Sequence, residues 1–218
     1  MARFTHLIFD LDGTLLHTLP ELLFNMNETF AALGLQGSFT EEEMATFIGN
    51  GKDEQIRRAM RARGIPATKF SEINALLSVY YAQKTVSRTK PFTGVESLLN
   101  TLKTRNIPVY VATNKPEHIA IDVVNHFFAN IPFLLVRGDK GDGIIKPEPA
   151  FLGSVIKTIN TPKENILFIG DSMVDYLTAK NAGITCAIVA HGYDKSVFTV
   201  SDPQLIFLER MEDLLRLI

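Results

Sequence analysis

Five short apolar runs recur along this sequence, and they constrain the fold more than any other feature. Each run is rich in Ile, Val, Leu and Phe, as is typical of strands buried on both faces of a parallel sheet. Segments with helical spacing separate the later runs, which predicts right-handed βαβ units. We therefore expect an α/β fold, a Rossmann-like parallel sheet flanked by helices. The runs occupy residues 5–12, 107–113, 132–138, 165–171 and 184–190.

The helical segments between the later strands carry their own boundary signals. The segment at 115–131 has apolar residues three and four apart, and prolines open the segment at 147–160. Gly183 follows the segment at 173–182 and suits the position just after a helix end.

Between the first two strands, residues 17–89 have an entirely helical character. About 70 residues are too many for one crossover connection, which needs little more than a dozen. We therefore expect an all-helical cap domain at 17–89, inserted into a catalytic α/β core domain at 1–16 and 90–218. The connections are expected near 15–18 and 86–92.

Within the cap, helices are expected at 20–34, 52–64 and 69–86. Ser/Thr followed three residues later by Glu is the pattern of a capping box, in which two side chains satisfy the first N–H groups of a helix. The sequence predicts one capping box at Thr18–Glu21 and another at Thr40–Glu43.

Composition excludes several classes of function. A chain of 218 residues with 46% apolar residues and a formal charge of −2 can build a core and shows no general attraction to nucleic acid. No signal peptide fits before Asp10, and no apolar stretch is as long as a membrane span. The single cysteine, Cys186, suits a reducing compartment. We expect a cytoplasmic protein that binds neither nucleic acid nor membrane; its oligomeric state is not readable.

Four polar motifs lie at the ends of strands or in loops. Ligands of open parallel sheets bind beyond the carboxyl ends of the strands, so these motifs are expected to meet. Each alone has an ordinary structural interpretation: a turn, a helix cap or a solvated lysine. A chance match to DxDGT is on the order of one in several hundred for a chain of this length, and four motifs in order make a shared site the better interpretation. They are "DLDGT" (10–14), "TNK" (113–115), "KPEP" (146–149) and "GDSMVD" (170–175).

This set supports phosphoryl transfer. Asp10 and Asp12 repel one another and lose hydration if buried, and a cation relieves both costs. Mg²⁺ takes oxygen ligands, which Asp10 and Asp171 are able to supply. One carboxylate attacks phosphorus, and a second acid protonates the leaving alcohol and later activates water.

Three further residues have expected contacts with the phosphate. Gly13 is expected to let backbone N–H groups approach it, Thr113 to donate its hydroxyl, and Lys146 to place a positive charge near it.

The motifs resemble those of the haloacid dehalogenase superfamily, and within it the phosphoglycolate phosphatase-like enzymes, over essentially the whole chain. The resemblance implies that Asp10 is the nucleophile and that Asp12 is the general acid/base and also a Mg²⁺ ligand through its backbone carbonyl. It further implies that Asp171 completes the metal site and that Asp175 orients Lys146 or a metal-bound water. Thr113, Asn114 and Lys146 are the expected substrate-binding residues of the core.

The cap is expected to choose the substrate. "FIGNG" (47–51) followed by "RRAM" (57–60) is similar to the cap signature of phosphoglycolate phosphatases. Arg58 is the first candidate, because a guanidinium grips a carboxylate through two hydrogen bonds; Asn50, Lys52 and Arg57 are further candidates. His17 stands where the family usually has Asp, and is either a hinge residue or a substrate contact.

The resulting hypothesis is a Mg²⁺-dependent phosphatase that hydrolyses a small phosphorylated metabolite, phosphoglycolate-like, through an aspartyl phosphate. A sugar phosphomutase of the β-phosphoglucomutase type on the same scaffold is the closest alternative. A signalling or binding module that carries an aspartyl phosphate is a third, although receiver domains are shorter and lack DxDGT. Asp12 argues against a dehalogenase, which has no leaving alcohol to protonate.

Overall fold

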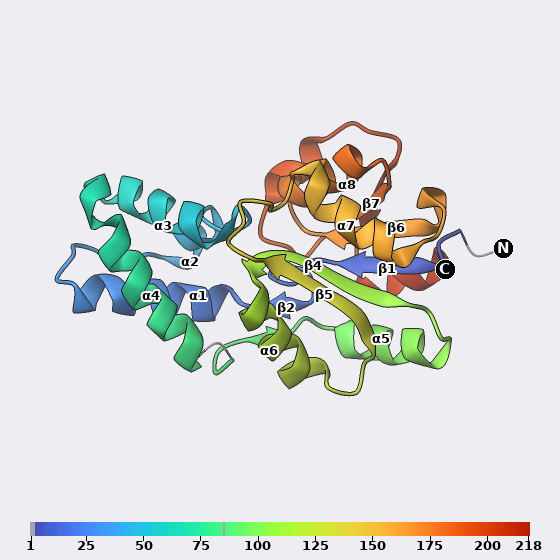
Figure 1. Ribbon diagram of the computed structural model, residues 1–218, viewed down its shortest axis with the longest axis horizontal. Coiled ribbons are helices and arrows are strands. Elements are labelled where there is room, and N and C mark those ends of the chain that lie inside the picture. Colours follow the sequence, from blue (N-terminus) through green and yellow to red (C-terminus); the bar gives the residue numbers. More distant parts are fainter. Residues whose placement is uncertain (1–2, 85) are drawn as a thin grey trace.

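A six-stranded sheet and a group of four helices lie side by side along the length of the molecule (Figure 1). The computed structural model describes residues 3–84 and 86–218, so residues 1–2 of the predicted core and residue 85 of the predicted cap lie outside the described residues. Every pair of neighbouring strands in the sheet is parallel. The strand order is β5 (Phe133–Asp139), β4 (Val109–Pro116), β1 (His6–Phe9), β6 (Ile166–Gly170), β7 (Thr185–Val189) and β8 (Leu205–Leu208).

The central strand β1 shows why the apolar runs form this sheet. Leu7 and Phe9 belong to the apolar cluster on one face and Ile8 to the cluster on the other, and none of the three is exposed. Helices cover both faces, so strands without alternation are the stable choice. The parallel α/β fold predicted from the five runs is confirmed. The covering helices are α5 (Val95–Thr104) and α6 (Glu117–Phe128) on one side and α7 (Pro149–Ile159) and α8 (Met173–Ala182) on the other (Figure 1).

Two elements of the core, the strand β8 and the helix α5, are not predicted from the sequence. The four residues of β8 are all apolar, but the strand is short and lies at the edge of the sheet, where Phe207 is 44% exposed. No helix was predicted at α5, although its four leucine and valine residues at helical spacing are buried. Four short 3-10 helices complete the described chain: η1 (Ala67–Lys69), η2 (Lys163–Asn165), η3 (Lys195–Thr199) and η4 (Met211–Arg216).

The inserted segment forms four helices that pack on one another. Buried side chains such as Met26, Phe30 and Ile56 form their common core. Two short strands, β2 (Leu16–His17) and β3 (Lys90–Pro91), pair antiparallel where the chain leaves and re-enters the sheet domain. Both lie in the segments expected to connect cap and core. The helices are α1 (Leu19–Ala32), α2 (Glu41–Ala45), α3 (Gly51–Ala62) and α4 (Phe70–Lys84).

Of the two capping boxes predicted in the cap, the one at Thr40 is confirmed. There the Glu43 N–H donates to Thr40 Oγ1 over 3.3 Å, and the Thr40 N–H donates to Glu43 Oε2 over 3.0 Å. The one at Thr18–Glu21 is wrong, because Thr18 makes no side-chain cap bond and Glu21 is used elsewhere. Glu21 Oε2 accepts the Arg88 N–H over 2.6 Å, so this carboxylate ties α1 to the returning connection.

None of the helices among residues 3–84 and 86–218 is both long and apolar enough to cross a bilayer.

The two threonines offer a matched test of this difference. Thr40→Ala should lower the free energy of unfolding by about 1 kcal/mol, because it removes a cap hydrogen bond. Thr18→Ala should change it by less than about 0.5 kcal/mol, because the buried Thr18 Oγ1 has no hydrogen-bond partner among the described residues. Urea unfolding of both variants measures the contrast, and a larger loss for Thr18→Ala would contradict the assignment.

Candidate active site

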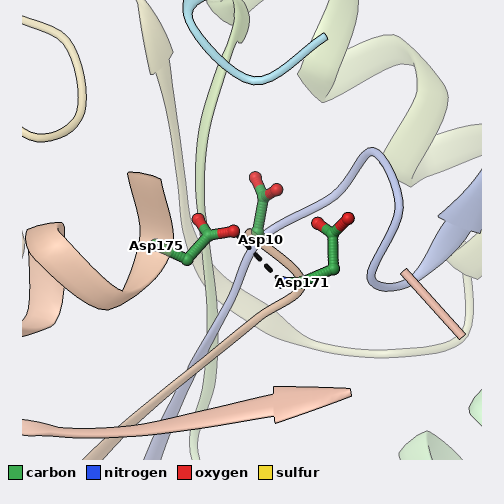
Figure 2. Close-up of side chains that lie close together, drawn as sticks. All are labelled: Asp10, Asp171 and Asp175. Carbon is green, nitrogen blue, oxygen red and sulfur yellow. Dashed lines mark hydrogen bonds between the residues drawn. The ribbon is translucent and has the colours of Figure 1, made fainter. Parts of the chain in front are cut away.

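Three buried carboxylates meet at the carboxyl edge of the sheet. Asp10 follows β1, Asp171 follows β6, and Asp175 lies in the first turn of α8. One oxygen of each lies within 4.8 Å of the others, and the residues are 7%, 3% and 0% exposed (Figure 2). β1 and β6 are neighbouring parallel strands, so their ends bring two acids together that are 161 positions apart in the sequence.

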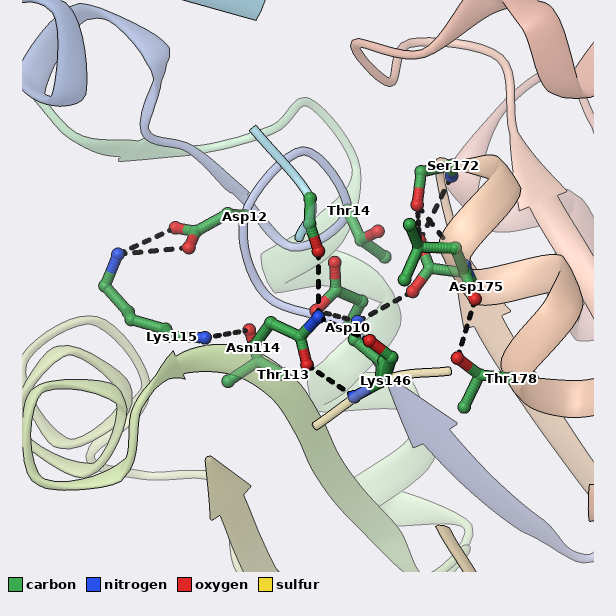
Figure 3. Close-up of polar contacts among 12 residues, drawn as sticks. Asp10, Asp12, Thr14, Thr113, Asn114, Lys115, Lys146, Ser172, Asp175 and Thr178 are labelled. Atoms are coloured by element: carbon green, nitrogen blue, oxygen red, sulfur yellow. Dashed lines mark hydrogen bonds and ion pairs between the residues drawn. The ribbon is translucent and has the colours of Figure 1, made fainter. Parts of the chain in front are cut away.

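One lysine lies within this cluster. Lys146 Nζ is 2.7 Å from Asp10 Oδ1 and 2.7 Å from Asp175 Oδ1, and the side chain is 3% exposed (Figure 3). Three carboxylates against one ammonium leave a formal charge of −2. This is the charge that one divalent cation balances.

The pKa shifts reflect this imbalance. Burial raises the pKa of Asp10 to about 7, with Lys146 opposing and Asp175 adding to the rise. Burial, followed by the charges of Asp175 and Asp10, raises the pKa of Asp171 well above its ordinary value. Burial alone would lower the pKa of Lys146, but the two carboxylates beside it raise that pKa above its usual range.

Both carboxylate oxygens of Asp175 accept hydrogen bonds from other groups of the protein. Its Oδ2 accepts the N–H groups of Asp171 and Ser172 over 3.1 Å each and the Ser172 hydroxyl over 2.6 Å, while Oδ1 accepts Lys146. The side chain therefore begins α8 as part of a capping box and orients the lysine. This is one of the two roles expected for it.

Asp10 and Asp171 remain as ligands for a cation. Asp171 accepts one N–H, from Tyr193 over 2.8 Å, and the Thr14 hydroxyl over 3.3 Å, which leaves lone pairs on both oxygens. Among the described residues, Asp10 has Lys146 as its only ion-pair partner. Carboxylate oxygens with free lone pairs in a site of negative charge fit a hard divalent cation.

Asp12 points away from the three acids. Its carboxylate oxygens lie 3.0 and 3.1 Å from Lys115 Nζ, and the lysine side chain is 5% exposed (Figure 3). The residue between Asp10 and Asp12 thus separates the two acids, as expected for an acid with a different task. Lys115 was missed in the sequence analysis, although it is the last residue of the "TNK" motif. The signal that could have identified Lys115 was its position as a cation at the end of a strand, close to several acids.

Thr113 and Asn114 reach the site from the end of β4. Thr113 is 2% exposed and lines the pocket described below. The Asn114 amide donates to the Gly49 carbonyl over 2.9 Å and to the Lys146 carbonyl over 3.0 Å, and its Oδ1 accepts the Lys146 N–H over 2.7 Å. Asn114 therefore positions Lys146 and binds a cap loop. These bonds leave no amide hydrogen for the substrate contact that was expected of it.

Gly13 packs closely against Asp171. Its N–H donates to the Leu16 carbonyl over 2.9 Å and so is not offered to a phosphate. Its φ is +89°, and a Cβ atom there would lie 2.4 Å from Asp171 Oδ2. Glycine is needed because the chain turns left-handed directly against the Asp171 carboxylate.

A pocket lies between the cap and the carboxyl edge of the sheet. The half-buried cation Lys52 lines the pocket on the side of the cap, and acids of the core line the other side. Arg58 is not among the residues that line the pocket. The Arg58 guanidinium instead donates to the Thr46 carbonyl over 2.9 Å and to Asn50 Oδ1 over 2.5 Å, within the cap. Core lining residues include Asp10, Asp12, Thr113, Lys115, Lys146, Asp171 and Tyr193, and cap lining residues include Leu22, Ile48, Lys52, Gln55 and Tyr81.

His17 lies outside this pocket, in β2 beside the connection to the cap. Its ring packs against Phe92 and Tyr193 with centroids 5.3 and 5.9 Å away, and its Nδ1 is 3.1 Å from the Tyr193 hydroxyl. This placement favours the hinge interpretation of His17. His191 is also partly buried there, and its Nε2 lies 3.0 Å from the Thr14 carbonyl oxygen.

Residues 7–189 match the family of haloacid dehalogenase-like hydrolases. The chain therefore belongs to this family, which confirms the resemblance seen in its motifs.

Proteins of similar sequence and structure are consistent with this family. The chain is 34% identical to the phosphoglycolate phosphatase of Pectobacterium atrosepticum, over 97% of this chain and 91% of that protein. It is 32% identical to the phosphoglycolate phosphatase of Mannheimia succiniciproducens, over 100% and 99%. The crystal structure of a predicted phosphoglycolate phosphatase from Haemophilus somnus superposes with a TM-score of 0.88 at 26% identity, over 99% of this chain and 98% of that chain.

The charge of the cluster predicts an unusual effect of Asp171→Asn. In metal-free protein at neutral pH, the variant should be more stable than the wild type by at least about 1 kcal/mol, or about 2–4 °C in Tm. The amide still accepts the Tyr193 N–H but carries no buried charge.

Magnesium should reverse this order. At a concentration 100 times its Kd, the wild type should gain about 2.7 kcal/mol, and Asp171→Asn much less. Calorimetry with and without magnesium measures both effects. Equal stabilisation of the two proteins by magnesium would remove Asp171 from the metal site.

Proposed function

We propose that this protein is a Mg²⁺-dependent phosphatase that hydrolyses a small phosphorylated carboxylic acid of the phosphoglycolate type. The observation that carries the proposal is the buried charge of −2 around Lys146, with Asp10 facing a pocket that the cap covers. The relatives named phosphoglycolate phosphatase, similar over nearly the whole chain, support the substrate class.

The first half of the reaction forms a bond to Asp10. A carboxylate oxygen of Asp10 attacks phosphorus, the bond from phosphorus to the leaving oxygen breaks, and Asp12 gives that oxygen a proton. Lys146, 2.7 Å from Asp10 Oδ1, stabilises the charge that develops on the phosphoryl group. Bound by Asp10 and Asp171, Mg²⁺ supplies the positive charge that lets an anionic ester approach an anionic nucleophile.

The second half returns Asp10 to its free state. Asp12, now a carboxylate, accepts a proton from water while the water oxygen attacks phosphorus and the bond to Asp10 breaks. Lys115 holds Asp12 through both oxygens, which is a contact with this carboxylate form. The products are the alcohol and inorganic phosphate.

The cap recognises the organic part of the substrate through Lys52. Its Nζ donates to Ser78 Oγ over 2.7 Å, and no carboxylate among the described residues forms an ion pair with it. Burial lowers the pKa of Lys52, with the charges of Asp53 and Asp139 opposing the change. A half-buried cation with no ion-pair partner and facing the pocket gains a counterion when a substrate carboxylate enters. Lys52 therefore takes the role expected of Arg58.

The experiment that tests the function is an assay of purified protein with phosphoglycolate, with magnesium and after chelation. The expected result is release of inorganic phosphate that depends on magnesium. An isomeric phosphate ester from a sugar phosphate, with no free phosphate, would instead identify a mutase. Absence of any turnover would contradict the proposal.

Asp10→Asn and Asp12→Asn should separate the two halves of the reaction. With p-nitrophenyl phosphate, whose leaving group needs no proton, Asp12→Asn should give a burst of one p-nitrophenolate per site and a phosphorylated protein. Its steady rate should fall by about 10²–10⁴-fold, because the water lacks a base.

Asp10→Asn should give neither the burst nor the phosphorylated protein, since an amide is a poor nucleophile. Rapid quench followed by mass spectrometry measures both. A phosphorylated Asp10→Asn protein would place the nucleophile elsewhere.

Lys52→Ala should reduce kcat/KM for phosphoglycolate by about 10–100-fold, the effect of losing a charged hydrogen bond of roughly 1.5–3 kcal/mol. Its effect on p-nitrophenyl phosphate, whose organic part carries no charge, should be much smaller. Lys69→Ala is the matched control, because Lys69 belongs to the same cap, its side chain is 44% exposed, and it pairs with Glu72. A selective loss in Arg58→Ala, and none in Lys52→Ala, would restore Arg58 as the binding residue.

A further inference from the structure

The loop that follows β7 contacts both the metal-binding acid and the start of the cap. At one end, the Tyr193 N–H donates to Asp171 Oδ2 over 2.8 Å, and a Cβ atom on Gly192 would lie 2.1 Å from the Cβ of Asp171. At the other end, the Tyr193 side chain reaches the residues that begin α1. One residue therefore spans the distance between the cation site and the hinge.

The Tyr193 hydroxyl uses all of its hydrogen-bonding capacity there. Its oxygen accepts the Thr18 N–H over 2.8 Å and the Leu19 N–H over 3.1 Å, which occupies both lone pairs. The remaining hydrogen is left to donate to His17 Nδ1, 3.1 Å away. Burial, followed by the charge of Lys90, lowers the pKa of His17 and so favours the neutral ring that this bond requires.

These bonds replace the helix cap that the sequence predicts at Thr18. The first N–H groups of a helix have no partner within it, and normally a side chain from the preceding residue accepts them. Here Thr18 makes no such bond, Pro20 has no N–H, and the Glu21 N–H binds the Thr18 carbonyl over 3.0 Å. Among the described residues, the only acceptor for the Thr18 and Leu19 N–H groups is a tyrosine of the core domain, 175 and 174 positions away.

We propose that Tyr193 is a positioning residue. It fastens the first cap helix, α1, to Asp171 and thereby sets how the cap lies over the pocket. The position of the cap decides whether Lys52 meets the organic part of a substrate. The effect on substrate choice rests on the proposed function, whereas the fastening itself does not.

Tyr193→Phe isolates the hydroxyl, because it keeps the ring against His17 and Phe92 and keeps the backbone N–H on Asp171. Tyr176→Phe is the matched control. The Tyr176 hydroxyl bonds Asp202 over 2.7 Å and Lys180 over 3.0 Å, outside the pocket and the cap. Both variants thus lose one hydroxyl from the core domain, and only one of them loses a contact with α1.

The first measurement is amide hydrogen exchange, resolved by residue. In Tyr193→Phe, exchange at Thr18 and Leu19 should be faster by about 3–10-fold, as expected for loss of a hydrogen bond. Amides in β1 and β6 should keep their wild-type rates, and magnesium affinity measured by titration calorimetry should stay within about twofold, because the Asp171 contacts remain. Tyr176→Phe should leave Thr18 and Leu19 unchanged.

The second measurement is the ratio of kcat/KM for phosphoglycolate to that for p-nitrophenyl phosphate. Tyr193→Phe should lower this ratio severalfold, mainly through KM for phosphoglycolate, while Tyr176→Phe should not. Unchanged exchange at Thr18 and Leu19 would overturn the proposal, and so would faster exchange with an unchanged ratio. Faster exchange throughout the sheet would also overturn it, because it would mean a general loss of stability. If the wild type does not hydrolyse phosphoglycolate, the proposed function fails, and the exchange data still decide whether Tyr193 fastens the hinge.

Discussion

The structure depends on a buried charge that the protein does not neutralise by itself. Asp10, Asp171 and Asp175 share one ammonium, that of Lys146, at nearly complete burial. Such a cluster destabilises a fold unless something else supplies positive charge. The surrounding chain limits this cost by fixing each group: a capping box holds Asp175, and the Tyr193 N–H holds Asp171. The negative charge that remains is the property a magnesium phosphatase requires.

The cap is fastened to this site at separate points, and each uses backbone groups of the cap. The Asn114 amide binds the Gly49 carbonyl, and the same amide positions Lys146. The Tyr193 hydroxyl binds the first N–H groups of α1, and the same residue contacts Asp171. Backbone contacts of this kind fix where the cap lies without specifying its side chains. Substitutions of other side chains on α3 and α4 would therefore leave both contacts in place.

Much of the fold and the core of the site could be predicted from the sequence, because both follow from local rules. Apolar runs without alternation mark buried parallel strands, and strand ends share an edge, which brings Asp10 to Asp171. What failed were choices between partners that lie far apart in the sequence. Glu21 fits a capping box by its spacing from Thr18, but its carboxylate binds the Arg88 N–H instead. A local sequence pattern does not show which of two possible partners a side chain binds, because the distant partner comes within reach only when the chain is folded.

Arg58, Lys52 and Lys115 show the same limit for charges. Each of these three cations lies in or close to a motif of the site. The role of each depends on whether its charge already has a partner within the protein. Arg58 is bound within the cap and Lys115 to Asp12, so of these three only Lys52 faces the pocket with no ion-pair partner among the described residues. A carboxylate supplies that counterion. A neutral group of the same size would cover the lysine and remove water from it without replacing the lost interactions. Under the proposed function, the same lysine that favours an acidic substrate therefore disfavours a neutral one.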